Sequence, residues 1–181
     1  MRSVEKEARS ILQVDLVEGF QGTAFGIMDG VITILGVVIG VAGATNNTPL
    51  VIVSGVVAGI ANAFGNSIGF YASELAERGE HMRKNMDLAS HKEMYKSSIL
   101  SFVASLVAMV VPIFPFILLP ADYAMVVAVA AAVVLLYALG SYVGHLSGLD
   151  RFRFGVRYIL LGLLGAGLAY VVGELLRSVM A

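Results

Sequence analysis

The chain has 181 residues, 58% of them hydrophobic and 14% charged, with a formal net charge of −1 and a mean hydropathy of +0.85. So apolar a composition excludes an ordinary soluble globular domain. The sequence has no Cys, which excludes disulfide bonds and thiolate metal ligands, and nothing in its charge pattern indicates a nucleic-acid partner.

Five segments are long and apolar enough to cross a bilayer, whose hydrocarbon core requires about 20 mainly apolar residues per helix. They cover residues 19–45, 50–73, 98–119, 123–146 and 158–176. Polar or Pro-containing breaks separate them. The sequence therefore predicts an all-α, multi-pass integral membrane protein, with five transmembrane helices in a domain of residues 19–181. In a prokaryote we expect it in the cell membrane.

The basic residues predict the orientation, because Lys and Arg near the ends of spans tend to stay in the cytoplasm. Eleven of the 12 lie in three segments, residues 2–9, 78–96 and 151–157, which five spans place on one side of the membrane. Only Arg177 lies on the other side. We therefore expect a cytoplasmic N-terminus and a C-terminus outside.

Residues 1–18 carry mixed charge with apolar residues at helical spacing. This pattern is typical of an amphipathic helix on the cytoplasmic surface. The alternative is a frayed polar tail.

The first span contains Asp29, the only charged residue between Glu18 and Glu74. Small residues recur beside it at steps of three and four, and such stripes let helices approach closely in a membrane. The stripe consists of Gly22, Gly26, Gly30, Thr33, Gly36 and Gly40. We interpret it as a packing surface, which predicts that Asp29 faces protein and not lipid.

The second span places Asn62 and Asn66 on one side, and Glu74 and Glu77 follow them toward the cytoplasm. This face could line a cation path, or the asparagines could simply form hydrogen bonds between helices. Residues 74–97 form a short charged connection to the third span. That connection is either a solvated charged helix or a funnel that collects cations.

The later spans offer less chemistry. Pro112 and Pro115 are expected to bend the third span, His145 lies near the inner end of the fourth, and the glycines of the fifth indicate packing. No zinc-type His/Glu pair lies in a span, and the sequence has no phosphate-binding glycine loop or nucleophile elbow. We therefore expect no enzymatic activity and no tightly bound cofactor.

A carboxylate at the depth of Asp29 must take up a proton or find a cation or hydrogen-bond donor. A group that holds H⁺ and a metal ion in turn couples their movement, and carboxylate with amide oxygen suits hard or borderline divalent cations. The structural alternative is an Asp29 capped by Asn or Ser side chains of another helix.

Four segments, in order, resemble the vacuolar iron transporter family of cation exchangers. They are "GIMDGVITILGVVIGVAGA", "GNSIGFYASELAERGE", "VPIFPF" and "GLDRFRFGVRYILLGLLGAGLAYVVGELL". The likeness covers nearly the whole chain, although the cytoplasmic metal-binding domain of many members is missing. It implies a homodimer in the lipid bilayer, with an ion path between the first and second helices, that exports Fe²⁺ or Mn²⁺ against protons.

The resemblance transfers unevenly to individual residues. Asp29 matches the aspartate of the family's "DG" motif, and Glu77 with Arg78 matches an acidic–basic pair. An acid of some members corresponds to Gly22, the expected methionine to Asn66, and a further acid or amide to Ala58. Without the methionine sulfur, a harder ion such as Mn²⁺ fits Asp29 and Asn66 as well as iron does.

Two hypotheses follow. In the first, the protein is a divalent cation/H⁺ antiporter, with Asp29 as the central metal ligand, Asn62 and Asn66 lining the path, and Glu74 and Glu77 at its entrance. In the second, it is a membrane scaffold that keeps the transporter fold and does not transport.

Overall fold

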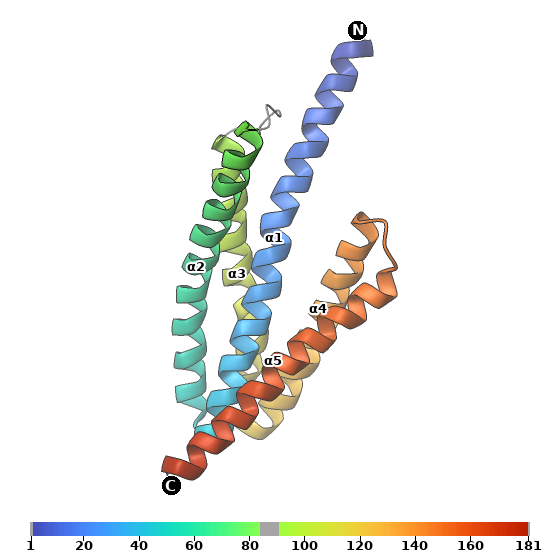
Figure 1. Ribbon diagram of the computed structural model, residues 1–181. Coiled ribbons are helices and arrows are strands. Elements are labelled where there is room, and N and C mark those ends of the chain that lie inside the picture. The colour runs from blue at the N-terminus through green and yellow to red at the C-terminus, as the bar shows by residue number, and fades with distance from the viewer. Residues whose placement is uncertain (1, 84–90, 181) are drawn as a thin grey trace.

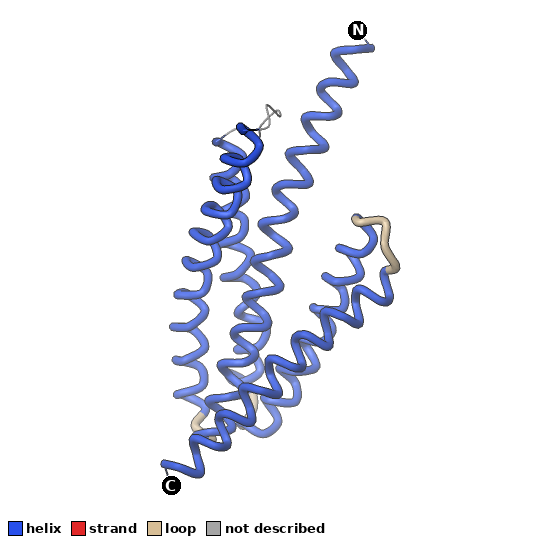
Figure 2. Tube along the Cα trace, in the orientation of Figure 1, coloured by secondary structure: helices blue, strands red, loops and turns tan. Residues whose placement is uncertain are grey.

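The computed structural model describes residues 2–83 and 91–180, and these residues form a bundle of five α-helices (Figure 1). The helices are α1 (Arg2–Thr45), α2 (Thr48–Arg83), α3 (His91–Leu118), α4 (Ala121–Leu146) and α5 (Arg151–Met180). No strand occurs in the described ranges, and short loops join α1 to α2, α3 to α4, and α4 to α5 (Figure 2). The expectation of an all-α protein is confirmed.

Successive helices run in opposite directions, so the two ends of the chain lie at opposite ends of the bundle (Figure 1). Each helix contains a stretch that is long and apolar enough to span a membrane. These stretches are Phe20–Thr45, Thr48–Glu77, Met94–Leu118, Ala121–Leu146 and Arg151–Val179. The five predicted spans are confirmed, and the protein is a multi-pass integral membrane protein. The cytoplasmic side of the N-terminus stays a prediction.

The fifth helix begins seven residues before the predicted span at residue 158. Asp150 explains the early start, because its Oδ1 accepts hydrogen bonds from the backbone N–H groups of Phe152 at 2.9 Å and Arg153 at 3.2 Å. A carboxylate in this position satisfies N–H groups that have no partner in the first turn of a helix. The basic residues 151–157 therefore form the first turns of α5 and not a loop before it.

The predicted connection of residues 74–97 is largely helical where it is described, since α2 continues to Arg83 and α3 starts at His91. Residues 84–90 lie outside the described chain. At the other end, α1 is one helix from Arg2 to Thr45, so residues 2–18 continue the axis of the first span without a break. That these residues lie on the cytoplasmic surface of the membrane stays a prediction.

α1 is the central helix, because it packs against each of the other four. Its apolar residues Ile34, Leu35 and Val38 are fully buried in a core to which α2, α3 and α4 contribute Val51, Phe116 and Leu136. Large apolar side chains cover the outer faces of α2 and α5, as expected where lipid surrounds the bundle. The region around Asp29 differs from this core, because polar side chains of three helices meet there.

Candidate ion site around Asp29

The carboxylate of Asp29 lies at the contact of α1 with α2, partly buried. Its Oδ2 accepts two hydrogen bonds, from Asn62 Nδ2 at 2.8 Å and from Asn66 Nδ2 at 2.9 Å. Its Oδ1 has one long contact, to the hydroxyl of Thr33 at 3.5 Å. Asp29 faces protein, as the sequence predicted, and its best donors are the two amides expected on the opposite helix.

Ser105 of α3 links Asn66 back to α1 and so completes the polar group around Asp29. Asn66 Nδ2 also donates to Ser105 Oγ at 2.8 Å, and Ser105 Oγ donates to the backbone carbonyl of Gly26 at 3.0 Å. Ser105 is 1% exposed and Asn66 is 9% exposed. The hydrogen bonds therefore run from the carboxylate on α1 through an amide on α2 and a hydroxyl on α3 back to α1.

Close backbone packing of α1 on α3 holds this arrangement. Gly26 lies about one turn before Asp29 and Gly30 directly follows it, and side chains at these two glycines would collide with the backbone of Ser101 and Ser105 respectively. Three buried serines on α3, spaced by four residues, face the three glycines of α1. They are Ser97, Ser101 and Ser105. Small residues on both helices thus permit the close approach that membrane helices use for packing.

The close packing of the glycine stripe also leaves no room for an acidic side chain at position 22, where some family members have one. A Cβ on Gly22 would meet the backbone carbonyl of Ser97, with the Ser97 Cα only 3.3 Å away. An acidic side chain there would push α3 away from α1. Ala58, the position of a further ligand in the family's pattern, packs its methyl group against the apolar core.

Glu74 and Glu77 are not brought to Asp29. They lie 8 and 11 residues after Asn66 on α2, which places them about 12 Å and 17 Å further along the helix axis. Glu74 is partly buried and Glu77 is exposed. Their role at an entrance stays a prediction.

Two residues of the site, Ser105 and Thr33, are not among the site residues predicted from the sequence. Thr33 is predicted only as part of the small-residue stripe, and the third span is expected to matter only for its prolines. A signal for Ser105 is present, since serines at positions 97, 101 and 105 repeat with the spacing of the glycines at 22, 26 and 30. Matching small-residue spacings on two spans can indicate which helices pack together.

The site offers oxygen donors around a single negative charge. In the described ranges, no three His, Asp or Glu side chains gather closely enough to hold a metal. The carboxylate oxygens, the amide carbonyls of Asn62 and Asn66, and two hydroxyl groups are the groups available, and all are oxygen ligands. Oxygen donors of this kind suit hard and borderline divalent cations.

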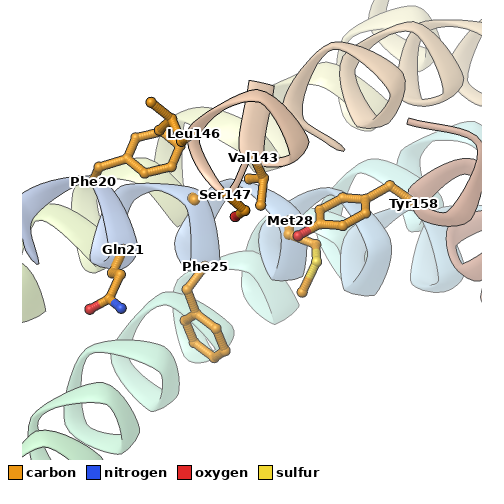
Figure 3. A pocket seen from close by; sticks show the side chains of 9 residues that line it. Phe20, Gln21, Phe25, Met28, Val143, Leu146, Ser147 and Tyr158 are labelled. Atoms are coloured by element: carbon orange, nitrogen blue, oxygen red, sulfur yellow. The ribbon is translucent and has the colours of Figure 1, made fainter. Parts of the chain in front are cut away.

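A pocket of about 450 Å³ lies on another side of α1, between this helix, the end of α4 and the start of α5 (Figure 3). Apolar side chains dominate its wall, with Gln21, Ser147 and Tyr158 as polar exceptions. Asp29 is not among its lining residues, although the neighbouring Met28 is. This pocket is therefore separate from the polar group between α1, α2 and α3.

Comparison with known proteins relates the chain to a sequence family and to another protein. The sequence model described as the VIT family matches residues 21–87 and 76–174. The uncharacterized protein MJ0645 of Methanocaldococcus jannaschii is 25% identical over 190 residues, which cover 95% of this chain and 98% of that protein. The family match includes the segments that carry Asp29, Asn62, Asn66 and Ser105.

Proposed function

Since the chain belongs to the VIT family, a family of metal-cation transporters and not of enzymes, we propose that it carries Fe²⁺ or Mn²⁺ out of the cytosol in exchange for protons. The observation that supports this proposal is the carboxylate of Asp29 at the depth of a membrane span, which accepts hydrogen bonds from two neutral amides of α2 in a polar group that Ser105 of α3 completes. An ionisable side chain in that position marks an ion path more often than a packing contact.

The exchange follows from the chemistry of a single carboxylate. Asp29 can bind a divalent cation only when it is deprotonated, and a proton that reaches the oxygen releases the cation. Alternate occupation by the two ions couples their movement in opposite directions. With amide and hydroxyl oxygens as the remaining ligands, Mn²⁺ fits as well as Fe²⁺.

The proposal includes a homodimer formed through α2. Gly65 and Gly69 of this helix are exposed, and a Cβ added at either position would meet no atom of the described chain within 4 Å. Ala61 and Ala72 extend the same exposed face. A second copy could approach closely there, and Asn62 lies beside this face, so the ion path would run near the subunit contact.

The direct test is cation flux into proteoliposomes driven by a pH gradient, with wild type compared with Asp29→Asn. The variant keeps a side chain of the same shape that cannot carry a negative charge, so we expect Mn²⁺ and Fe²⁺ flux to fall to the level of empty vesicles. Glu174→Gln is the matched control, because Glu174 is another acid in a span but is exposed. Asp29→Asn flux equal to that of wild type would contradict the mechanism.

The scaffold hypothesis has one observation in its favour, namely that Asp29 finds its donors within its own chain. It predicts that Asp29→Asn changes the stability of the protein but that no metal binds. Calorimetry of the detergent-solubilised protein with Mn²⁺, Fe²⁺ and Co²⁺ separates the two. A heat of binding that disappears in Asp29→Asn supports the transporter, and no heat with any of the three ions supports the scaffold.

A further inference from the structure

Ser105 dictates which way the amide of Asn66 faces. The Gly26 carbonyl can only accept a hydrogen bond, so the single hydroxyl proton of Ser105 is used on it. The hydroxyl oxygen then has only lone pairs left for Asn66. Asn66 must therefore present its Nδ2 to Ser105, and its Oδ1 lies on the opposite side of the amide group.

Both N–H bonds of Asn66 are committed, one to Ser105 Oγ and one to Asp29 Oδ2. Turning Oδ1 toward Asp29 would break both hydrogen bonds and would bring Oδ1 against the lone pairs of Ser105. The residue is only 9% exposed, so water cannot readily replace the lost partners. Asn66 is therefore fixed as a donor to the carboxylate.

Asn62 differs in each respect. It makes one side-chain hydrogen bond in the described chain, to Asp29 Oδ2, and it is less buried than Asn66. Turning its amide breaks that single contact, and a cation beside the carboxylate would compensate for the loss. Asn62 can therefore change from N–H donor to oxygen ligand.

We propose that the two asparagines have different roles: Asn62 turns its carbonyl oxygen onto the bound cation, whereas Asn66, held by Ser105, positions the Asp29 carboxylate and does not bind the ion. This inference rests on the proposed cation transport. It makes Ser105 a positioning residue and Asn62 the ligand that responds to the ion.

The first test needs no metal. The chain has five asparagines, so ¹⁵N-asparagine labelling gives five side-chain NH₂ pairs, which single substitutions assign. We expect the Asn66 pair to exchange with solvent more slowly than the Asn62 pair. Ser105→Ala should speed Asn66 exchange about fivefold or more, and Ser105→Thr, which keeps a hydroxyl, should restore slow exchange. Ser101→Ala, one turn away, is the control. Exchange of Asn66 as fast as that of Asn62 in wild type would overturn the inference.

The second test compares Mn²⁺ affinity by calorimetry in Asn62→Asp and Asn66→Asp. Aspartate keeps an oxygen ligand but removes the N–H donors. Asn62→Asp should bind Mn²⁺ as tightly as wild type or more tightly, because the ligand gains charge. Asn66→Asp should bind about tenfold or more weakly, the usual effect of removing a group that orients a ligand.

The two outcomes separate this inference from the function on which it rests. Equal changes in both variants would overturn the division of roles while leaving cation binding in place. If wild type binds no Mn²⁺ or Fe²⁺, the proposed function fails, and the role of Asn62 as a ligand fails with it. Slow exchange of Asn66 that depends on the Ser105 hydroxyl would then still show that Asn66 is a fixed donor.

Discussion

The two halves of the membrane-spanning part of α1 use the same packing device in different surroundings. In the first half, Gly22, Gly26 and Gly30 lie against the serines of α3. In the second half, Gly36 and Gly40 lie against Ala169 of α5, and Gly43 against the ring of Tyr170. The first contact includes the hydroxyl, amide and carboxyl groups around Asp29, whereas the second is apolar.

This difference indicates that glycine stripes by themselves say nothing about function. Close packing on α5 joins the helix pair α4 and α5 to the bundle through apolar contacts. Close packing on α3 also brings Ser105 near enough to reach across to the Gly26 carbonyl and the Asn66 amide. The polar half of α1 is therefore where a substitution should affect both stability and ion binding.

The largest contrast should come from adding one methyl group to each half. Gly26→Ala puts a Cβ against the Ser101 carbonyl and 3.0 Å from the Cβ of Ala104, so α3 must shift. We expect a loss of about 2 kcal/mol in the free energy of unfolding. Gly36→Ala meets only the Ala169 Cβ at 3.6 Å and should be neutral or up to about 1 kcal/mol stabilising. Denaturant unfolding in detergent measures the free energy of unfolding of the two variants. Equal changes in Gly26→Ala and Gly36→Ala would contradict the expected difference between the two halves of α1.

A smaller contrast is expected within the serines of α3. Ser105→Ala leaves a buried N–H of Asn66 without its partner, which should lower the free energy of unfolding by about 1–2 kcal/mol. Ser101 is fully buried, and its hydroxyl has no hydrogen-bond partner in the structure as described. Ser101→Ala should therefore be neutral or stabilising. Thermal unfolding of the two variants side by side checks this. A larger loss of stability in Ser101→Ala than in Ser105→Ala would show that the polar group around Asp29 is unimportant for stability.

The smallest effect is expected at Glu174, in the half of the bundle that packs against the apolar end of α1. Glu174 is exposed, and its Oε2 lies 3.9 Å from Nη1 of Arg177, three residues away on the same helix. Exposed ion pairs contribute little, so Glu174→Gln should change the free energy of unfolding by less than about 0.5 kcal/mol. It should leave Mn²⁺ binding unchanged in calorimetry. A clear loss of binding would move part of the ion path to α5.

The five spans are predictable because hydrophobic length and basic segments are properties of the sequence alone. Helix ends are predicted less well. The start of α5 depends on Asp150, a capping residue whose effect is local, whereas the prediction rests on hydropathy, which the following Arg residues lower. The continuous α1 also contains no proline between residues 2 and 45 that could mark a boundary.

Of the candidate site, the need of Asp29 for a partner is predictable from the cost of a lone acid in a membrane, and helical spacing puts Asn62 and Asn66 on one side of the second span. Their pairing with Asp29 follows from the family resemblance, which implies an ion path between the first and second helices. Ser105 is not predictable in this way, because its importance depends on which helix lies against Gly26 and on the rotation of α3. A hydrophobicity pattern does not determine either of these. Glu74 and Glu77 follow on the same helix, but helical rise takes them away from the carboxylate.

The position of Asp29 along α1 also has an electrical consequence. It lies nine residues from Phe20 and 16 from Thr45, so it is roughly one third of the way across the membrane-spanning stretch. Between Asp29 and Thr45 the core is apolar, with Ile34, Leu35 and Val38 fully buried. A divalent cation leaving Asp29 toward that end would cross about two thirds of the membrane potential, a step worth about 3 kcal/mol per 100 mV. If the proposed exchange of a divalent cation for protons takes place at Asp29, its flux should therefore depend on voltage as well as on the pH gradient.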